Sequence, residues 1–161
     1  MRALLYLELN RSKTVADDWV EKYRANRKAE NQVSEAELIK AKYAIAGAPR
    51  LFKSIADRVK RDVEAYGDRA LSYSFVPSSK FIVRRAIYPT VELDVVINTV
   101  SLEYSYSSKT DQASEEISSD GIILIKADLA GNVQAFQNGL PFKDEIEVSE
   151  SLLKLVFDNL P

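Results

Sequence analysis

Apolar residues in the first part of the chain recur every three or four positions, which is the period of an α-helix. Val15, Trp19 and Tyr23 are each one helical turn apart. A second series with helical spacing follows: Val33, Ala36, Ile39 and Tyr43. Because residues 24–32 between the two series are polar, they are either an exposed stretch of one long helix or a break between two helices. Residues 1–10 fit either a strand or a helix.

The ends of the helical region carry recognisable signals. Thr14-Val-Ala-Asp17 has the form of a capping box, which predicts a helix start near residue 14. Gly47-Ala48-Pro49 predicts a stop, because glycine suits the residue after a helix and proline suits the first turn of the next one. We therefore expect helices at about residues 14–46 and 50–66.

The second helix carries a regular apolar stripe, and Gly67 directly after it is a natural stop. The stripe consists of Phe52, Ile55, Val59, Val63 and Tyr66. Its spacings of three and four residues are typical of an amphipathic helix that packs on a core.

From Leu71 the period changes from about 3.6 to 2, which predicts β-strands. About six strands follow over residues 71–137, as an antiparallel meander that includes 81–88, 91–97, 100–107, 122–127 and 133–137. Residues 107–119 are polar and acidic and predict a hairpin loop, and Gly131 predicts a turn with positive φ. Ser149 then caps a last helix over 149–160.

The expected fold class is therefore α+β, with N-terminal helices, a meander and a C-terminal helix. At 161 residues, one domain covering 1–161 is expected. Its helical part comprises residues 1–68, its sheet 69–140 and its C-terminal helix 148–161.

Two short turns would fix the register of the sheet. If Pro89-Thr90 and Asn98-Thr99 are two-residue turns, the strand that begins at Val91 has a defined core face. That face would bring two groups of residues together: Val91, Leu93, Val95 and Ile97 on one strand, and Val100, Leu102, Tyr104 and Tyr106 on the next.

The same register places Arg85 beside Asp94 on the opposite face, and Asp94 directly opposite Glu103. Two facing carboxylates repel unless a cation compensates for them. One interpretation is a solvated cross-strand charge ladder. The alternative is a small acid/base or cation site in which one carboxylate raises the pKa of its neighbour.

This register also leaves four apolar residues on the outer face, which makes them candidates for a protein interface: Phe81, Val83, Ile87 and Val96. Exposed apolar groups of this size are unusual in a monomer. They predict either a covering C-terminal helix or a second chain, and a homodimer is the simplest case. Arg84 would point inward.

Charge allows a further interpretation, nucleic-acid binding by the helix at 50–61. Residues 1–70 carry 15 Lys and Arg against 11 Asp and Glu, whereas residues 71–161 carry 7 against 13. The cations of this helix are Arg50, Lys53, Arg58, Lys60 and Arg61. They could bind phosphates, but acidic residues interleave with them at the spacing of ion pairs along a helix.

The chain contains no histidine and no cysteine. This excludes disulfides and the common His- or Cys-based catalytic and metal sites, and it fits a reducing cytoplasm. No phosphate-binding glycine loop occurs, no apolar run is long enough for a membrane span, and neither a cofactor nor a metal is expected.

These observations favour a non-catalytic protein–protein interaction or assembly module that associates with itself, through the outer face of the sheet or the C-terminal helix. A nucleic-acid-associated protein and a small carboxylate-dependent enzyme are the two alternatives.

Overall fold

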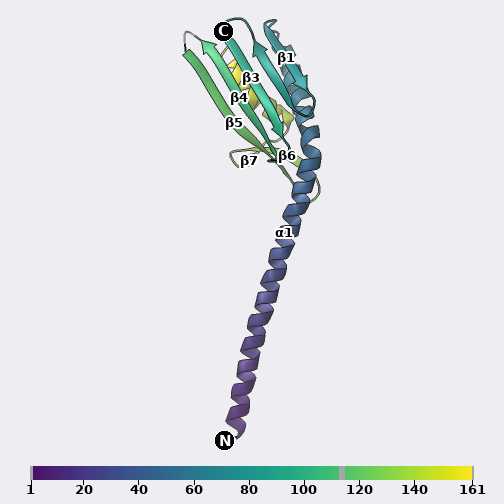
Figure 1. Cartoon of the computed structure of the whole chain (residues 1–161), viewed down its shortest axis with the longest axis vertical. Helices are drawn as coiled ribbons and strands as arrows, with labels where there is room; N and C mark the ends of the chain where they lie inside the picture. Colours follow the sequence, from purple (N-terminus) through teal and green to yellow (C-terminus); the bar gives the residue numbers. More distant parts are fainter. Residues whose placement is uncertain (1, 113–114, 161) are drawn as a thin grey trace. The chain divides into compact units, whose positions relative to one another are not determined.

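The computed structural model describes the backbone of residues 2–112 and 115–160, and the side chains of residues 19–112 and 116–160. It confirms the α+β class, with a long N-terminal helix, a seven-stranded antiparallel sheet and a C-terminal helix (Figure 1). The elements are α1 (Arg2–Tyr66), β1 (Leu71–Val76), β2 (Lys80–Arg85), β3 (Thr90–Asn98), β4 (Glu103–Gln112), β5 (Glu115–Ala127), β6 (Val133–Gln137), β7 (Leu140–Pro141) and α2 (Glu145–Phe157). The chain forms two compact units, residues 1–39 and residues 40–161.

The predicted interruption of the helix at Gly47-Ala48-Pro49 is wrong, because α1 continues through Pro49 to Tyr66. A proline inside a helix costs about 3 kcal/mol, since it removes one hydrogen bond and crowds the carbonyl four residues earlier. That carbonyl belongs to Ile45, whose side chain is exposed. The burial of Ala48 and Phe52, which lie on either side of the proline in sequence, offsets the cost.

Gly47 has a different role from the predicted stop. A Cβ atom at this position would overlap the side chain of Val133, so glycine allows α1 to approach β6 closely.

The start predicted at Thr14 is also wrong, since α1 begins at Arg2, and this settles the choice for residues 2–10 in favour of a helix. The predicted stop at Gly67 is confirmed, because Gly67 follows the last helical residue with a φ of 79°.

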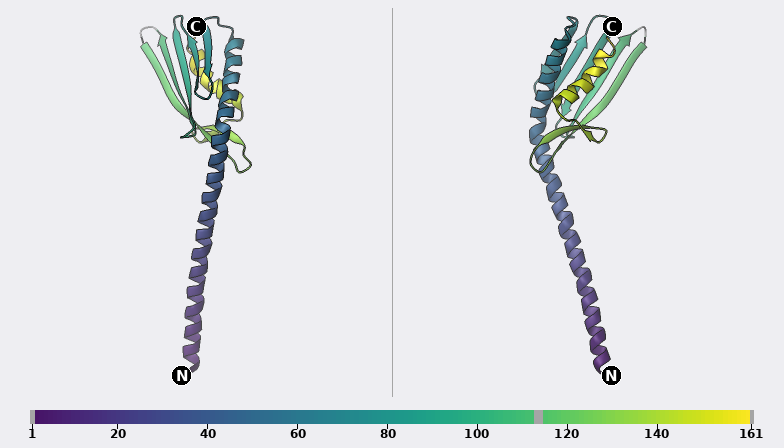
Figure 2. Two further views of the ribbon diagram at one scale, coloured as in Figure 1. Left: turned by 45° about the vertical axis from the view of Figure 1, so that its right-hand side comes forward. Right: turned by 180° about the vertical axis from the view of Figure 1, so that it is seen from behind.

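The seven strands are hydrogen-bonded in their sequence order, so every connection is a hairpin between neighbours. Residues 40–66 of α1 and the helix α2 pack on one face of this sheet, and Figure 2 shows α2 lying across it. Phe52 of α1 lies at the centre of the core, with its ring centroid 5.1 Å from Tyr104 and 5.5 Å from Phe81. The other face of the sheet is not covered by a described helix.

The predicted pairing of β3 with β4 is wrong by four positions. Asn98 pairs with Glu103, and the connection is the four-residue turn Thr99–Leu102. The side-chain oxygen of Asn98 accepts hydrogen bonds from the backbone amides of Val100 and Ser101, which stabilises the longer turn. Since four is an even number, Tyr104 and Tyr106 still face the core side.

The predicted pairing of β2 with β3 is wrong by three positions, and an odd shift turns the whole of β2 over. Arg85 pairs with Val91, so the connection runs from Ala86 to Pro89. The Arg85 guanidinium donates hydrogen bonds to the carbonyl oxygens of Ile87 and Pro89, at 2.7 and 3.0 Å. These bonds hold residues 86–89 in a loop rather than a strand.

Residues 107–119 do not form the predicted loop, because β4 and β5 extend through most of them. Backbone ladders do not require apolar side chains, and the core side here is filled by the small polar residues Ser108 and Thr110.

The last helix begins at Glu145 rather than 149. Its cap is Asp144, whose carboxylate accepts from the amides of the next turn, whereas Ser149 is buried within the helix.

Candidate interaction surface

Residues 19–39 of α1 form a helix whose large apolar side chains lie in solvent. Trp19 is 66% exposed, Val33 64% and Leu38 60%, and Tyr23 and Ile39 are also exposed. An apolar side chain left in water forgoes roughly 1.5–3 kcal/mol of burial free energy. We name residues 19–39 the exposed helix segment.

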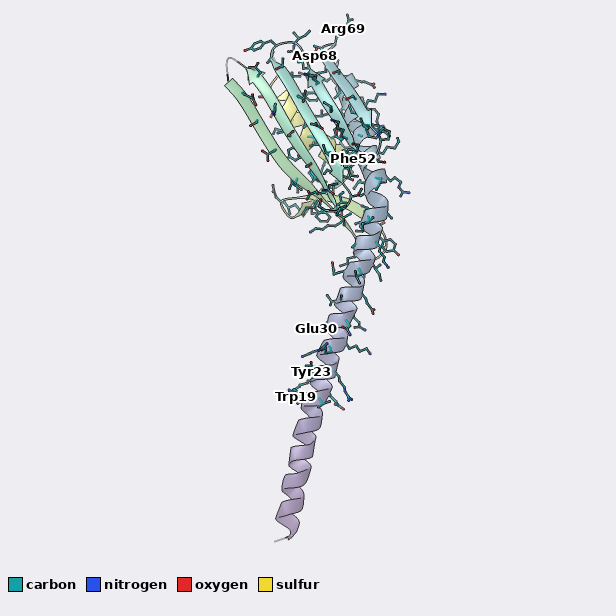
Figure 3. All side chains as sticks on the ribbon, in the orientation of Figure 1. Trp19, Tyr23, Glu30, Phe52, Asp68 and Arg69 are labelled. Carbon is teal, nitrogen blue, oxygen red and sulfur yellow. The ribbon has the colours of Figure 1, made fainter. Side chains whose placement is uncertain are left out.

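Three side chains at successive turns of this segment contact one another. The rings of Trp19 and Tyr23 are stacked, with centroids 5.8 Å apart, and Figure 3 shows them one above the other along the helix. The Arg27 guanidinium lies 5.7 Å from the centre of the Tyr23 ring, and its Nε donates a 3.3 Å hydrogen bond to the Tyr23 hydroxyl. The result is an exposed aromatic cluster with a cation at one end.

The charges of the segment are mostly not neutralised within it. Arg24 and Lys28 make no ion pair with a described side chain, and neither do Glu30 and Glu35. Together with Tyr23 and Arg27, the two cations line a shallow hollow of about 500 Å³ along the helix surface. The charges of Arg24, Lys28, Glu30 and Glu35 are therefore available to another molecule.

The uncovered face of the sheet is a second candidate surface. Three of its exposed apolar side chains lie close together, Val96 on β3 and Ile122 and Leu124 on β5. Around them the face carries small hydroxyl side chains on β1, β4 and β5: Ser72, Ser74, Ser105, Ser107 and Ser118. One open face is ordinary for an antiparallel sheet, so this surface is less unusual than the exposed helix segment.

Two of the four predicted interface residues are not on any surface. Phe81 and Val83 are fully buried, because the turn-over of β2 points them into the core. Arg84, predicted to point inward, instead lies outside and pairs with Glu92 at 3.2 Å. Ile87 and Val96 are exposed, Ile87 in the loop after β2 and Val96 on the open face.

The predicted carboxylate site is not assembled. Asp94 lies opposite Ser107, and Glu103 lies opposite Asn98 at the far end of β3. Lys80 is the cation nearest to Asp94, at 3.9 Å, and Oδ1 of Asp94 is buried without a hydrogen-bond partner among the described residues. The corrected register therefore removes the geometric basis of an acid/base pair.

Arg85, the third member of that predicted site, has a structural role. Its Nε donates a 2.9 Å hydrogen bond to Asp68, in the turn between α1 and β1. The Asp68 carboxylate accepts first from the Ala70 amide and then from Arg85, and both bonds lower the pKa of Asp68. Arg85 thus joins the turn before β1 to the loop after β2.

The predicted basic face of α1 is largely paired with acids of the same helix. Lys53 contacts Asp57 at 2.6 Å, and Arg58 contacts Asp62 at 2.8 Å, the spacing expected from the sequence. Lys60 lies 3.8 Å from Glu64, and the Nε of Arg61 donates to the carbonyl oxygen of Asp57. Arg50 is exposed. These pairs compete with any phosphate, although nucleic-acid binding by this helix stays untested.

The C-terminal helix does not offer an apolar surface, because its apolar stripe faces the core. Val148, Leu152, Leu153 and Val156 are all buried. Ser149 donates a 2.7 Å hydrogen bond to Asp62, which fixes α2 against α1. Apolar residues at helical spacing identify a helix but not what covers it, so the sequence pattern alone does not mark the exposed helix segment as a site.

Comparisons with known proteins add no relationship to this picture: no protein-family model, curated protein or solved structure matches the chain. Among the described residues, no three acidic side chains are grouped closely enough to hold a metal ion. Nor does any helix in that part of the chain combine the length and apolar character that crossing a bilayer requires.

Proposed function

We propose that this protein is a self-associating interaction module whose contact surface is the exposed helix segment. The observation that supports this is the exposure of Trp19, Tyr23 and Val33, which helical spacing places on one side of α1. A helix without tertiary packing is only marginally stable in water, since most helical stability in proteins comes from burying one face. Pairing with a second copy supplies that missing burial.

Sedimentation equilibrium of the full chain tests the proposal. We expect a concentration-dependent dimer, and we expect Val33→Glu to shift it toward monomer because a carboxylate cannot be buried cheaply. Gln32→Glu is the matched control, since it adds the same charge at a neighbouring exposed position that helical spacing places away from Trp19 and Tyr23, and it should leave a larger dimer fraction. A monomer at all concentrations up to several hundred micromolar contradicts the proposal.

The same measurement separates the two surfaces. If the exposed helix segment carries the contact, Ile122→Glu on the open face of the sheet leaves the dimer unchanged. If Ile122→Glu dissociates the dimer and Val33→Glu does not, the open face carries the contact and the proposed surface is wrong.

A further inference from the structure

One edge of the sheet is covered over only part of its length. The strand β5 spans Glu115–Ala127, but β6 pairs only with Leu124–Ala127, and Figure 1 shows β5 as the outermost strand over the rest of its length. Residues 116–121 therefore pair with β4 on one side and with no described strand on the other. We name residues 116–121 the free edge of β5.

The free edge presents unpaired backbone groups from alternate residues. In an antiparallel ladder the N–H and C=O of one residue point to the same side, and successive residues point to opposite sides. The Ile125 amide donates to the carbonyl oxygen of Leu102, directly before β4, so the odd-numbered residues of β5 point toward β4. Because the register is regular, Glu116, Ser118 and Asp120 point away from β4. Such an edge is a template for a further strand.

The side chains of these three residues lie on the open face of the sheet, where acidic groups are not neutralised. Glu116 lies directly opposite Asp111 of β4, and facing carboxylates on a sheet repel unless a cation compensates for them. Neither of them, nor Asp120, forms an ion pair with a described side chain, and neither does Lys109 opposite Ser118. A cation on an added strand would relieve this repulsion.

The charges also decide which strand fits the free edge. A second copy of β5 would bring further carboxylates beside Glu116 and Asp120, so this edge disfavours pairing with itself. A strand with basic side chains at these two positions is complementary in charge. On the core side Ile117 is 48% exposed, and an apolar side chain of the added strand would cover it. Since side chains alternate between faces, the fitting strand is basic on one face and apolar on the other.

We infer that the free edge of β5 binds an extended segment of another protein by β-strand addition. Lysine or arginine side chains of that segment lie beside Glu116 and Asp120, and its apolar side chains lie beside Ile117. The contact is separate from the exposed helix segment, so it does not depend on the proposed self-association.

A synthetic peptide of sequence Val-Lys-Val-Thr-Val-Lys-Val is the probe, because its lysines have the spacing of Glu116 and Asp120 and its sequence reads the same in both directions. With a fluorophore at its N-terminus, anisotropy in the presence of the full chain measures the dissociation constant. We expect saturable binding at least about tenfold tighter than for the same peptide with glutamate in place of lysine. Equal binding of the two peptides, or no binding of either, would overturn the inference.

Substitutions in the chain locate the bound peptide. Glu116→Gln should raise the dissociation constant at least about threefold, because it removes one of the facing charges. Glu103→Gln is the matched control, since Glu103 lies at the other end of β4 on the same face of the sheet, and it should have little effect. Equal effects would place the peptide elsewhere and contradict the inference. Val33→Glu should leave peptide binding unchanged, whatever it does to self-association.

N-methylation of the peptide separates backbone pairing from attraction of charges. Methyl groups on the lysine and threonine nitrogens remove the donors that face β5 and should weaken binding by about tenfold or more. Methyl groups on the valine nitrogens point to the outer edge of the added strand and should be tolerated. If both sets weaken binding equally, the peptide does not extend the sheet.

Hydrogen exchange of the amides of the full chain, followed by NMR, tests the edge directly. We expect Glu116, Ser118 and Asp120 to exchange quickly in the free chain and slowly with the peptide bound. Ile117 and Ser119, whose amides point toward β4, should exchange slowly in both states. Slow exchange of all five amides in the free chain would show that the edge is already covered. That result, or peptide binding without slowed exchange, would overturn the inference.

Discussion

Two parts of the same helix use apolar residues in opposite ways. In residues 40–66 of α1, Ala48, Phe52 and Val59 are fully buried against the sheet. In residues 19–39, Trp19 and Val33 are about two-thirds exposed. Helical periodicity predicts both parts equally well, so it identifies a helix without identifying what covers it.

The difference between the two parts lies in the arrangement of their apolar residues. Residues 40–66 form one continuous stripe that a single sheet face can cover. In residues 19–39 the large apolar residues are fewer, and helical spacing spreads them around the helix, with Ile39 on the side opposite Trp19 and Tyr23. A continuous stripe favours burial within the chain, whereas scattered apolar residues among charges favour a less extensive contact with another molecule.

The strongest test of this contrast compares one residue from each part. We expect Phe52→Ala to lower the free energy of unfolding by about 3–5 kcal/mol, because it leaves a cavity in the core. Leu38→Ala should change it by less than about 0.5 kcal/mol under dilute, monomeric conditions. Chemical denaturation followed by circular dichroism measures both. Equal effects would mean that the exposed helix segment is packed within its own chain.

Close packing of α1 on β6 predicts the next largest effect. Gly47→Ala should cost about 1–3 kcal/mol, since the added methyl group overlaps the Val133 side chain. Gly47→Ala combined with Val133→Ala should cost less than the sum of the two single changes. Additive costs in this double-mutant cycle would contradict direct contact between the two positions.

A single buried hydroxyl gives a smaller test. Tyr104 donates a 2.9 Å hydrogen bond to the carbonyl oxygen of Ala48, next to the proline in α1. Tyr104→Phe keeps the ring and removes this bond, so we expect a loss of about 1 kcal/mol in denaturant melts. Tyr23→Phe, in the exposed helix segment, is the matched control and should be close to neutral in the monomer.

Alkaline pH provides the smallest expected effect. Burial, assisted by the Asp57 carboxylate, raises the pKa of Tyr73 to about 12, compared with about 10 in an unfolded chain. The folded state therefore holds the Tyr73 proton more tightly than the unfolded chain does. The resulting stabilisation of the folded state is complete below about pH 10 and is lost as the pH rises toward 12. Tyr73→Phe should make the decline in stability over this range shallower. A decline of unchanged slope would assign the pH dependence to other groups.

Much of the fold was predictable because it depends on local periodicity. The helix over 50–66 with its stop at Gly67, the change to strands at Leu71, and the inward direction of Tyr104 all agree with the structure. The continuity of α1 through Pro49 was not predictable in the same way. It depends on packing of residues distant in sequence, which outweighs a local preference.

The site residues predicted on the sheet were harder to place, because their positions depended on two turns. The turn before β3 is held by hydrogen bonds from Arg85, a residue with no turn signal of its own. An error of three residues in the predicted turn assigns Phe81 and Val83 to the surface, although both are buried. It also assigns Arg84 to the core, although it is exposed. Alternation in a strand specifies two faces but not which face is buried, so one misplaced turn reverses every assignment on that strand.

The hydrogen bond between Ser149 and Asp62 has a consequence for how the chain folds. These residues are separated by 87 positions, whereas each strand of the sheet pairs with its immediate neighbour in sequence. Hairpins between neighbours close short loops and form quickly, while a long loop costs more entropy to close and contributes its contacts later. The docking of α2 onto α1 is therefore expected to be the last step of folding, and substitutions at Ser149 should accelerate unfolding without slowing the assembly of the sheet.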